Sequence, residues 1–208
     1  MKPLIYIIIP LTFCLTACLG GKAPVNQFYL LDYPADYHSK GLDTLTTLHK
    51  TCRLNVVEVL APFSSHQIVL RTDSHQVTFF AQNEWAVRPE QSLTQIAKTF
   101  LNEQRVFERT TTGSLILATD YTLQIQVRRL ELIGEKKEYN AHLDMTFSLV
   151  DNYSDKVILE YNSSRIQPLD ERSINLFVSV ISQLFVEELD VFSKKILTKT
   201  PDEKAKAG

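Results

Sequence analysis

The feature that most constrains the fold is a long run of strictly alternating apolar and polar side chains at residues 139–149. Successive side chains of a β-strand point to opposite faces of a sheet, so this alternation predicts a strand that is buried on one face and exposed to solvent on the other. The apolar face of such a sheet has to be covered by a second layer. The apolar members are Tyr139, Ala141, Leu143, Met145, Phe147 and Leu149, and the polar members are Asn140, His142, Asp144, Thr146 and Ser148.

Two more strands flank this one at short distances. Residues 121–127 alternate in the same way, and the phase then shifts by one residue at Arg128-Arg129, as a β-bulge would produce. Residues 134–137 and 151–155 are turn sequences, and the apolar residues 157–161 follow. Because the connections are short, the three strands are predicted to form an antiparallel meander.

The first half of the chain contains shorter strand signals. A β-branched stretch stops at Ala61-Pro62, and two apolar runs on either side of the turn residues 72–75 predict a hairpin. Residues 110–113 (Thr-Thr-Thr-Gly) are expected to break the chain. The predicted strands in this half cover residues 28–31, 53–60, 66–71 and 76–81, with a short one at 106–107, and residues 32–51 are predicted to be a loop.

Two amphipathic helices complete the pattern. Pro89 suits the first turn of a helix that is expected to end near Gln104. A second helix is predicted to begin near Asp170 or Ser173, and its apolar stripe is wide enough for a subunit contact as well as a core. The expected fold is an α+β two-layer sandwich, with a mainly antiparallel twisted sheet and both helices packed on one face. The apolar positions are Leu93, Ile96, Ala97, Phe100 and Leu101 in the first helix and Leu176, Phe177, Val180, Ile181, Leu184, Phe185, Leu189, Phe192 and Ile196 in the second.

The N-terminus carries a targeting signal. Residues 4–17 have no charge and follow Lys2, which indicates a secretory signal peptide. The run is shorter than the about 20 residues of a membrane-spanning helix. It ends in Leu15-Thr16-Ala17-Cys18, which resembles the lipobox of bacterial lipoproteins. The resemblance implies that the Cys18 thiol is acylated and that the chain is cut before it. An ordinary signal peptide that happens to contain a cysteine is the alternative.

The chain is therefore expected to have four parts: a signal peptide (1–17), a lipidated flexible leader (18–27), a single α+β domain (28–199) and a disordered tail (200–208). Its net charge of −2 gives no sign of the basic surface that nucleic acid requires. An apolar content of 44 % is sufficient to build a core.

Few residues suggest chemistry of their own. The sequence has no phosphate-binding glycine loop, nucleophile elbow or zinc-protease pattern, so no catalytic residue, cofactor or metal site is predicted. Cys52 is expected to be a small buried hydrophobe, with pairing between chains or reactivity as alternatives. Trp85 is expected in the core, with an interface anchor as the alternative. His142 is expected to be solvated. Arg128-Arg129 is interpreted as a bulge with a solvated charge, or less simply as a contact with a partner or lipid headgroup.

A set of short motifs follows in order along the chain: an early Tyr29-Leu30-Leu31, a strand leading from Val56 to Pro62, the segment Ile68-Val69-Leu70-Arg71, Trp85 before a helix, and Leu101 at its end. With these motifs, the block of residues 54–101 resembles the ABC-type transport auxiliary lipoproteins, which include PqiC-like proteins of MCE lipid-transport systems. Residues 63–67 depart from the charged stretch that the family often has after the proline.

The resemblance implies a non-enzymatic lipoprotein on the inner leaflet of the outer membrane, facing the periplasm. It would dock the periplasm-spanning MCE-domain protein of an intermembrane lipid transport system, and a homo-oligomer would suit that role. Leu19 supports the outer membrane, because the family's sorting rule retains proteins with Asp at that place in the inner membrane. The alternative is a structural or assembly lipoprotein of another cell-envelope complex.

Overall fold

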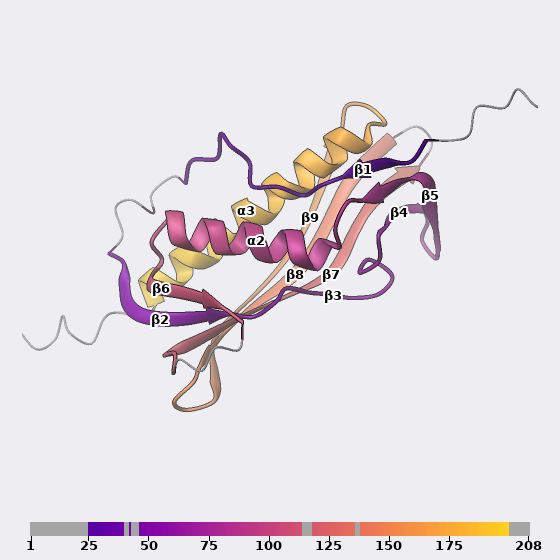
Figure 1. Cartoon of the computed structure of the whole chain (residues 1–208). Helices are drawn as coiled ribbons and strands as arrows, with labels where there is room; N and C mark the ends of the chain where they lie inside the picture. The colour runs from indigo at the N-terminus through magenta and orange to yellow at the C-terminus, as the bar shows by residue number, and fades with distance from the viewer. Residues whose placement is uncertain (1–24, 40–41, 43–45, 114–117, 136–137, 200–208) are drawn as a thin grey trace, which may run out of the picture.

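A computed structural model describes residues 25–39, 42, 46–113, 118–135 and 138–199. Within them, nine strands form one mixed, mostly antiparallel sheet, and two helices lie against one of its faces (Figure 1). The predicted α+β sandwich is confirmed. In chain order the elements are β1 Gln27–Tyr29, β2 Leu48–Leu54, β3 Glu58–Val59, β4 Gln67–Asp73, β5 Gln76–Trp85, α2 Pro89–Glu103, β6 Phe107–Thr112, β7 Tyr121–Glu135, β8 Glu138–Asp151, β9 Lys156–Leu169 and α3 Ile174–Lys199.

The meander of β7, β8 and β9 forms the main part of the sheet. Both neighbouring pairs are antiparallel, and the register of β7 on β8 shifts between Val127 and Arg129, which confirms the predicted bulge. The apolar members of the alternating run on β8 are buried against the helices, apart from Tyr139, which is half-buried. The strand β9 continues to Leu169, well past the predicted end at residue 161. The turn predicted at 134–137 lies partly outside the described residues.

The strand predicted at residues 53–60 is in fact two strands. β2 ends at Leu54 and β3 covers only Glu58–Val59. Between them the backbone bonds elsewhere, since the amide of Val57 donates to Thr94 Oγ1 on α2 at 2.8 Å. The prediction of a single strand was wrong because a helix side chain takes a donor that the ladder would otherwise use.

Parallel pairings attach the remaining strands. β2 starts at Leu48, inside the predicted loop, and runs parallel to β6 and β7. β6 extends through Thr110–Thr112, where a break was expected, because these residues pair with residues 52–54 of β2. β4 and β5 form the predicted hairpin, and β4 is parallel to β7. The end of β5 is parallel to β1, with Tyr29 opposite Trp85.

The two helices begin and end close to where the sequence places them. Pro89 opens α2, and its apolar face is buried as predicted. Ser173 caps α3: its Oγ accepts a hydrogen bond from the backbone amide of Leu176 at 3.2 Å. The helix is buried on more sides than its predicted stripe, since Ser182, Glu188 and Asp190 are also covered.

The segment that follows β1 explains this extra burial. Residues 30–39 run over the helix layer, on the side away from the sheet (Figure 1). The side chain of Leu31 is buried there, and the amide of Asp32 donates to Ser182 Oγ at 3.3 Å. The Tyr37 hydroxyl donates to Asp190 Oδ2 at 3.0 Å. Part of the predicted loop is therefore a third layer, which covers α3 on the side away from the sheet.

Candidate functional site

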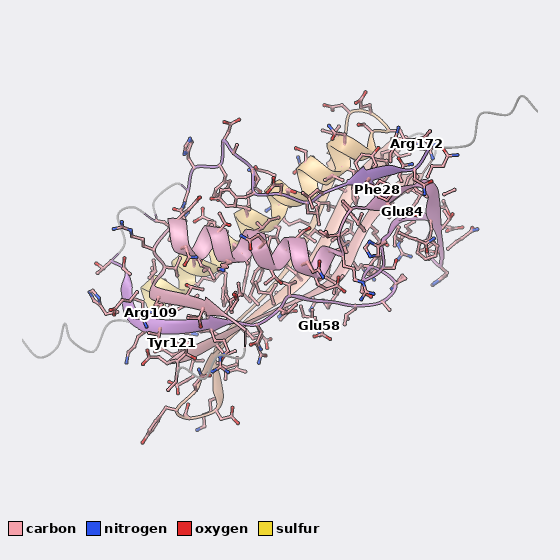
Figure 2. The ribbon with its side chains drawn as sticks, viewed as in Figure 1. Phe28, Glu58, Glu84, Arg109, Tyr121 and Arg172 are labelled. Carbon is pink, nitrogen blue, oxygen red and sulfur yellow. The ribbon has the colours of Figure 1, made fainter. Side chains whose placement is uncertain are left out.

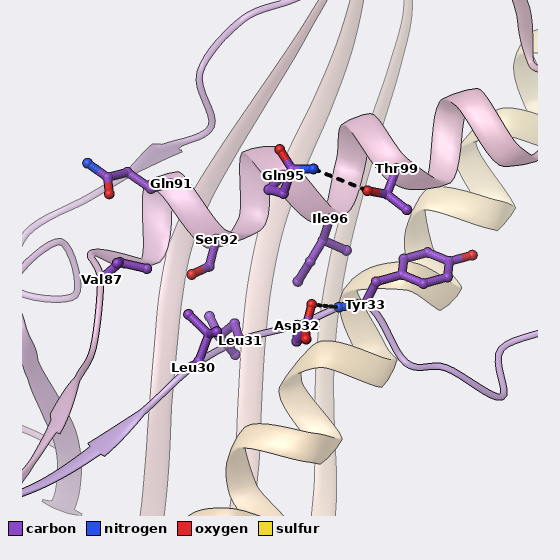
Figure 3. Close-up of a pocket in the computed structure, with 10 residues that line it drawn as sticks. All are labelled: Leu30, Leu31, Asp32, Tyr33, Val87, Gln91, Ser92, Gln95, Ile96 and Thr99. Atoms are coloured by element: carbon purple, nitrogen blue, oxygen red, sulfur yellow. Dashed lines mark hydrogen bonds between the residues drawn. The ribbon is translucent and has the colours of Figure 1, made fainter.

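An apolar groove lies between the segment after β1 and the first turns of α2 (Figure 3). Its volume is about 210 Å³. Leu30, Leu31 and Val87 give it apolar walls, and Ile96 closes it toward the core. The remaining lining side chains are Asp32, Tyr33, Gln91, Ser92, Gln95 and Thr99.

The groove is smaller than the roughly 300–1,000 Å³ of sites that enclose a small-molecule ligand. Some of its polar groups are engaged locally: the side-chain amide of Gln95 donates to Thr99 Oγ1, and Asp32 accepts from the backbone amide of Tyr33. Burial raises the pKa of the Tyr33 phenol to about 12, and the charge of Glu103 adds to the effect, so the phenol stays neutral. The groove suits contact with an apolar surface or chain.

A buried charge network lies on the opposite, open face of the sheet and overturns the expectation that His142 is solvated. His142 Nδ1 lies 3.1 Å from Glu131 Oε1, and both side chains are buried. Arg71 donates from Nε to Glu131 Oε1 at 2.9 Å, and its Nη2 lies 2.8 Å from Oε2. Burial alone would raise the pKa of Glu131, but the hydrogen bonds from His142 and Arg71 and the Arg71 charge hold it below its usual value.

The same network reaches β9, because His142 Nε2 lies 3.4 Å from Ser164 Oγ. A carboxylate, an imidazole and a hydroxyl thus stand in a row. The Glu131 carboxylate is, however, held on both oxygens by the Arg71 guanidinium. The network therefore connects four strands, β4, β7, β8 and β9. Apart from His142, no local feature of the sequence had indicated it.

A second polar network fixes α3. Asp190 accepts from Tyr37, from Ser39 Oγ at 2.7 Å and from Lys194 Nζ at 3.0 Å. Nearby, the Tyr161 hydroxyl donates to Glu188 Oε2 at 2.6 Å. A hollow of about 600 Å³ adjoins this network. Four of its charged side chains are already paired, Arg165 with Glu187 and Lys194 with Asp190, so these groups are less available to bind a ligand.

Other residues singled out by the sequence have structural roles. Cys52 is buried as predicted, and burial raises the pKa of its thiol to about 12, so the thiol is inert at neutral pH. Trp85 is in the core as predicted, 6.2 Å from the ring of Phe177. Arg128 is on the open face and pairs with Asp144, so its charge is not simply solvated.

The predicted lipidation residue, Cys18, lies outside the described residues, as do the signal peptide and the tail at 200–208. Among the residues that are described, no three His, Cys, Asp or Glu side chains are grouped so that they could hold a metal ion. No helix in the described ranges has both the length and the apolar character that crossing a membrane demands.

Solved structures share this α+β sandwich. Protein XCC0632 from Xanthomonas campestris has a TM-score of 0.65 and 13 % identity over 84 % of this chain and 94 % of its own. A crystal structure of an uncharacterized protein has a TM-score of 0.61 and 16 % identity over 83 % and 99 %. At such identities the likeness concerns the fold alone.

The family is identified from the sequence. The chain belongs to the ABC-type transport auxiliary lipoprotein components, whose model matches residues 39–189, from the segment over the helices into α3. No curated protein matches the chain. Its class is thus a lipoprotein that assists an ABC-type transporter, and the predicted family resemblance is confirmed.

Proposed function

We propose that this chain is an outer-membrane lipoprotein, facing the periplasm, that acts without catalysis in an MCE-type intermembrane lipid transport system. It docks the periplasm-spanning MCE-domain protein at the outer membrane. The observation that carries the proposal is the combination of the family match over residues 39–189 with a lipobox ending at Cys18.

Three features support the anchor and its place in the outer membrane. The lipobox residues Leu15-Thr16-Ala17-Cys18 close an uncharged run after Lys2. The other cysteine of the mature chain, Cys52, is buried with a raised pKa, which favours Cys18 as the modified thiol. One acyl chain holds a protein only marginally while two or more hold it stably, so full acylation makes Cys18 a permanent tether. Leu19, in the place where Asp would retain the protein in the inner membrane, supports the outer membrane.

The chemistry of the described residues supports a role through contacts. The groove is apolar and small, and the buried Glu131 is neutralised by Arg71. Assembly of several copies into a homo-oligomer stays a prediction.

Affinity capture of the acylated protein from a cross-linked cell envelope tests the proposal. Recovery of an MCE-domain protein is the expected result, and recovery of only barrel-assembly or cell-wall proteins would contradict it. The Cys18→Ala variant is the control for the anchor, since it should yield a soluble or uncleaved product. A processed Cys18→Ala chain that still fractionates with the outer membrane would show that the lipobox interpretation is wrong.

A further inference from the structure

Exposed apolar side chains gather where the described chain begins. Val25 is 78 % exposed, Phe28 63 %, Leu30 51 % and Val87 36 %. Large side chains exposed singly are ordinary on a protein surface, whereas a group of them marks a contact site. We refer to these four residues as the N-terminal apolar patch.

Phe28, Leu30 and Val87 are brought to one place because β1 pairs with the end of β5, and Val25 comes just before β1 in the chain. The amide of Ala86 donates to the carbonyl of Tyr29 at 2.7 Å, which places Val87 beside Leu30. Both side chains line the groove of Figure 3. Phe28 is two residues before Leu30 in an extended segment, so the two side chains point to the same side.

We propose that the N-terminal apolar patch rests on the lipid surface of the membrane leaflet that holds the anchor. This inference depends on the proposed acylation of Cys18. Seven residue steps separate Cys18 from Val25, and even a fully extended chain of that length spans at most about 25 Å. The patch is therefore confined to the neighbourhood of the bilayer.

The opposite end of the domain is not confined in this way. Figure 2 places Phe28 and Tyr121 at opposite ends of the molecule. Tyr121 pairs with Asp151, so the β8–β9 turn with Tyr153 is at the far end. The 14 residues of β8 alone span about 46 Å, which is longer than the extended chain between Cys18 and Val25. The exposed apolar residues of the patch are thus at the end of the domain that this short chain keeps near lipid.

The surroundings of the patch fit the headgroup level of a bilayer. Arg88 is exposed and directly follows Val87, where its guanidinium can meet lipid phosphates. Phe28 is opposite Glu84 in the β1–β5 register, so a carboxylate shares its face of the sheet. A carboxylate resists transfer into hydrocarbon, so the patch sits at the interface and does not enter the bilayer core.

Quenching of tryptophan fluorescence by brominated lipid tests the contact. Phe28→Trp is compared with Tyr153→Trp, an aromatic replacement at a fully exposed residue of the far turn. Vesicles contain phosphatidylethanolamine and phosphatidylglycerol, part of it with brominated acyl chains. Buried Trp85 contributes the same background to both variants.

Two preparations separate this inference from the proposed anchor. One is the protein as acylated in the cell, checked by its mass. The other is the chain from Cys18, coupled through that thiol to a maleimide lipid, with which buried Cys52 does not compete. A cell-made protein without acyl chains would contradict the proposed anchor, while the coupled chain would still decide the patch.

Brominated lipid should quench the Phe28→Trp variant on the order of twofold more than the Tyr153→Trp variant, because interfacial aromatic rings sit at headgroup level. Equal quenching in the coupled preparation would overturn the proposal. So would an emission shift in the Phe28→Trp variant that follows protein concentration and ignores bromine, since that would indicate a second copy on the patch. If Phe28→Trp does not fold by circular dichroism, Val87→Trp replaces it.

Discussion

Along β8, the covered and the open faces of the sheet can be compared residue by residue. On the covered face, Leu143, Met145 and Phe147 are fully buried beneath the helices. On the open face, Thr146 is half-buried and polar, while His142 is buried and bonded to the Glu131 carboxylate. The covered face contributes stability through the hydrophobic effect, which involves no titrating group and no charge pair that salt could screen. The open face contributes through paired charges, so its share should depend on pH and on screening by salt.

The largest effect is expected from Phe147→Ala on the covered face. The Phe147 ring stacks 5.2 Å from Phe192 and 6.0 Å from Tyr161. Removing it leaves a cavity that costs about 4 kcal/mol of unfolding free energy. The melting temperature should fall by roughly 10 °C, as measured on the unacylated Cys18→Ser chain. Thr146→Ala, one residue along on the open face, is the matched control, and an equal loss there would contradict the contrast between the faces.

Arg71→Met is expected to be nearly as damaging. It leaves the Glu131 carboxylate buried beside His142 without its guanidinium partner. Removing one partner of a buried ion pair costs about 3 kcal/mol, which denaturant unfolding would measure. The double variant Arg71→Met/Glu131→Gln should recover part of this loss, since it removes the unpaired charge. A double variant as unstable as the sum of its two single changes would argue against the network.

The pH dependence of stability should show the same network. Because the pKa of Glu131 is lower in the folded chain than its ordinary value of 4.5, the folded state holds this proton less tightly. Its contribution is complete above that value and is lost as the pH falls below it, through the folded pKa. As the pH is lowered from about 6 to about 3, the unfolding free energy should fall less steeply in Glu131→Gln than in the unchanged chain. Identical slopes would mean that another carboxyl governs this range.

The smallest effect is expected from Arg128→Met at the bulge. Arg128 pairs with Asp144 but keeps 36 % of its side chain exposed. Such pairs contribute about 0.5 kcal/mol and are weakened by salt. The difference in unfolding free energy should therefore shrink further in molar salt. A loss as large as that of Arg71→Met would mean that the two arginine sites differ less than their exposure suggests.

Much of the fold follows from local pattern. The long strand on β8, the bulge near Arg128, the two helices and the Ser173 cap were all predicted, because alternation, spacing and capping chemistry depend on neighbouring residues. The extension of β9 to Leu169 was missed, since its polar stretch at residues 162–165 carries no strand signal and relies on pairing with β8. β2 was underestimated for the same reason, as its residues 48–51 pair with β6.

The candidate sites were harder to predict because they depend on distant pairings. His142 belongs on the open face by parity, and parity alone indicates solvent. Only the parallel pairing of β4 with β7, where Leu70 is opposite Leu132, brings Arg71 over Glu131. The groove likewise needs the segment after β1 to lie on α2. By contrast, Cys18 was read from a local motif.

The strand β9 also bears on how the protein tolerates damage. Among the described strands it pairs only with β8, so its outer edge leaves a row of backbone donors and acceptors open for 14 residues. An edge of this kind can template pairing with other chains. Pro168 removes one donor, and Arg165 ties the edge to Glu187 and Glu188 on α3. A chain truncated before α3 would lose that cover, and we expect it to aggregate through intermolecular strand pairing.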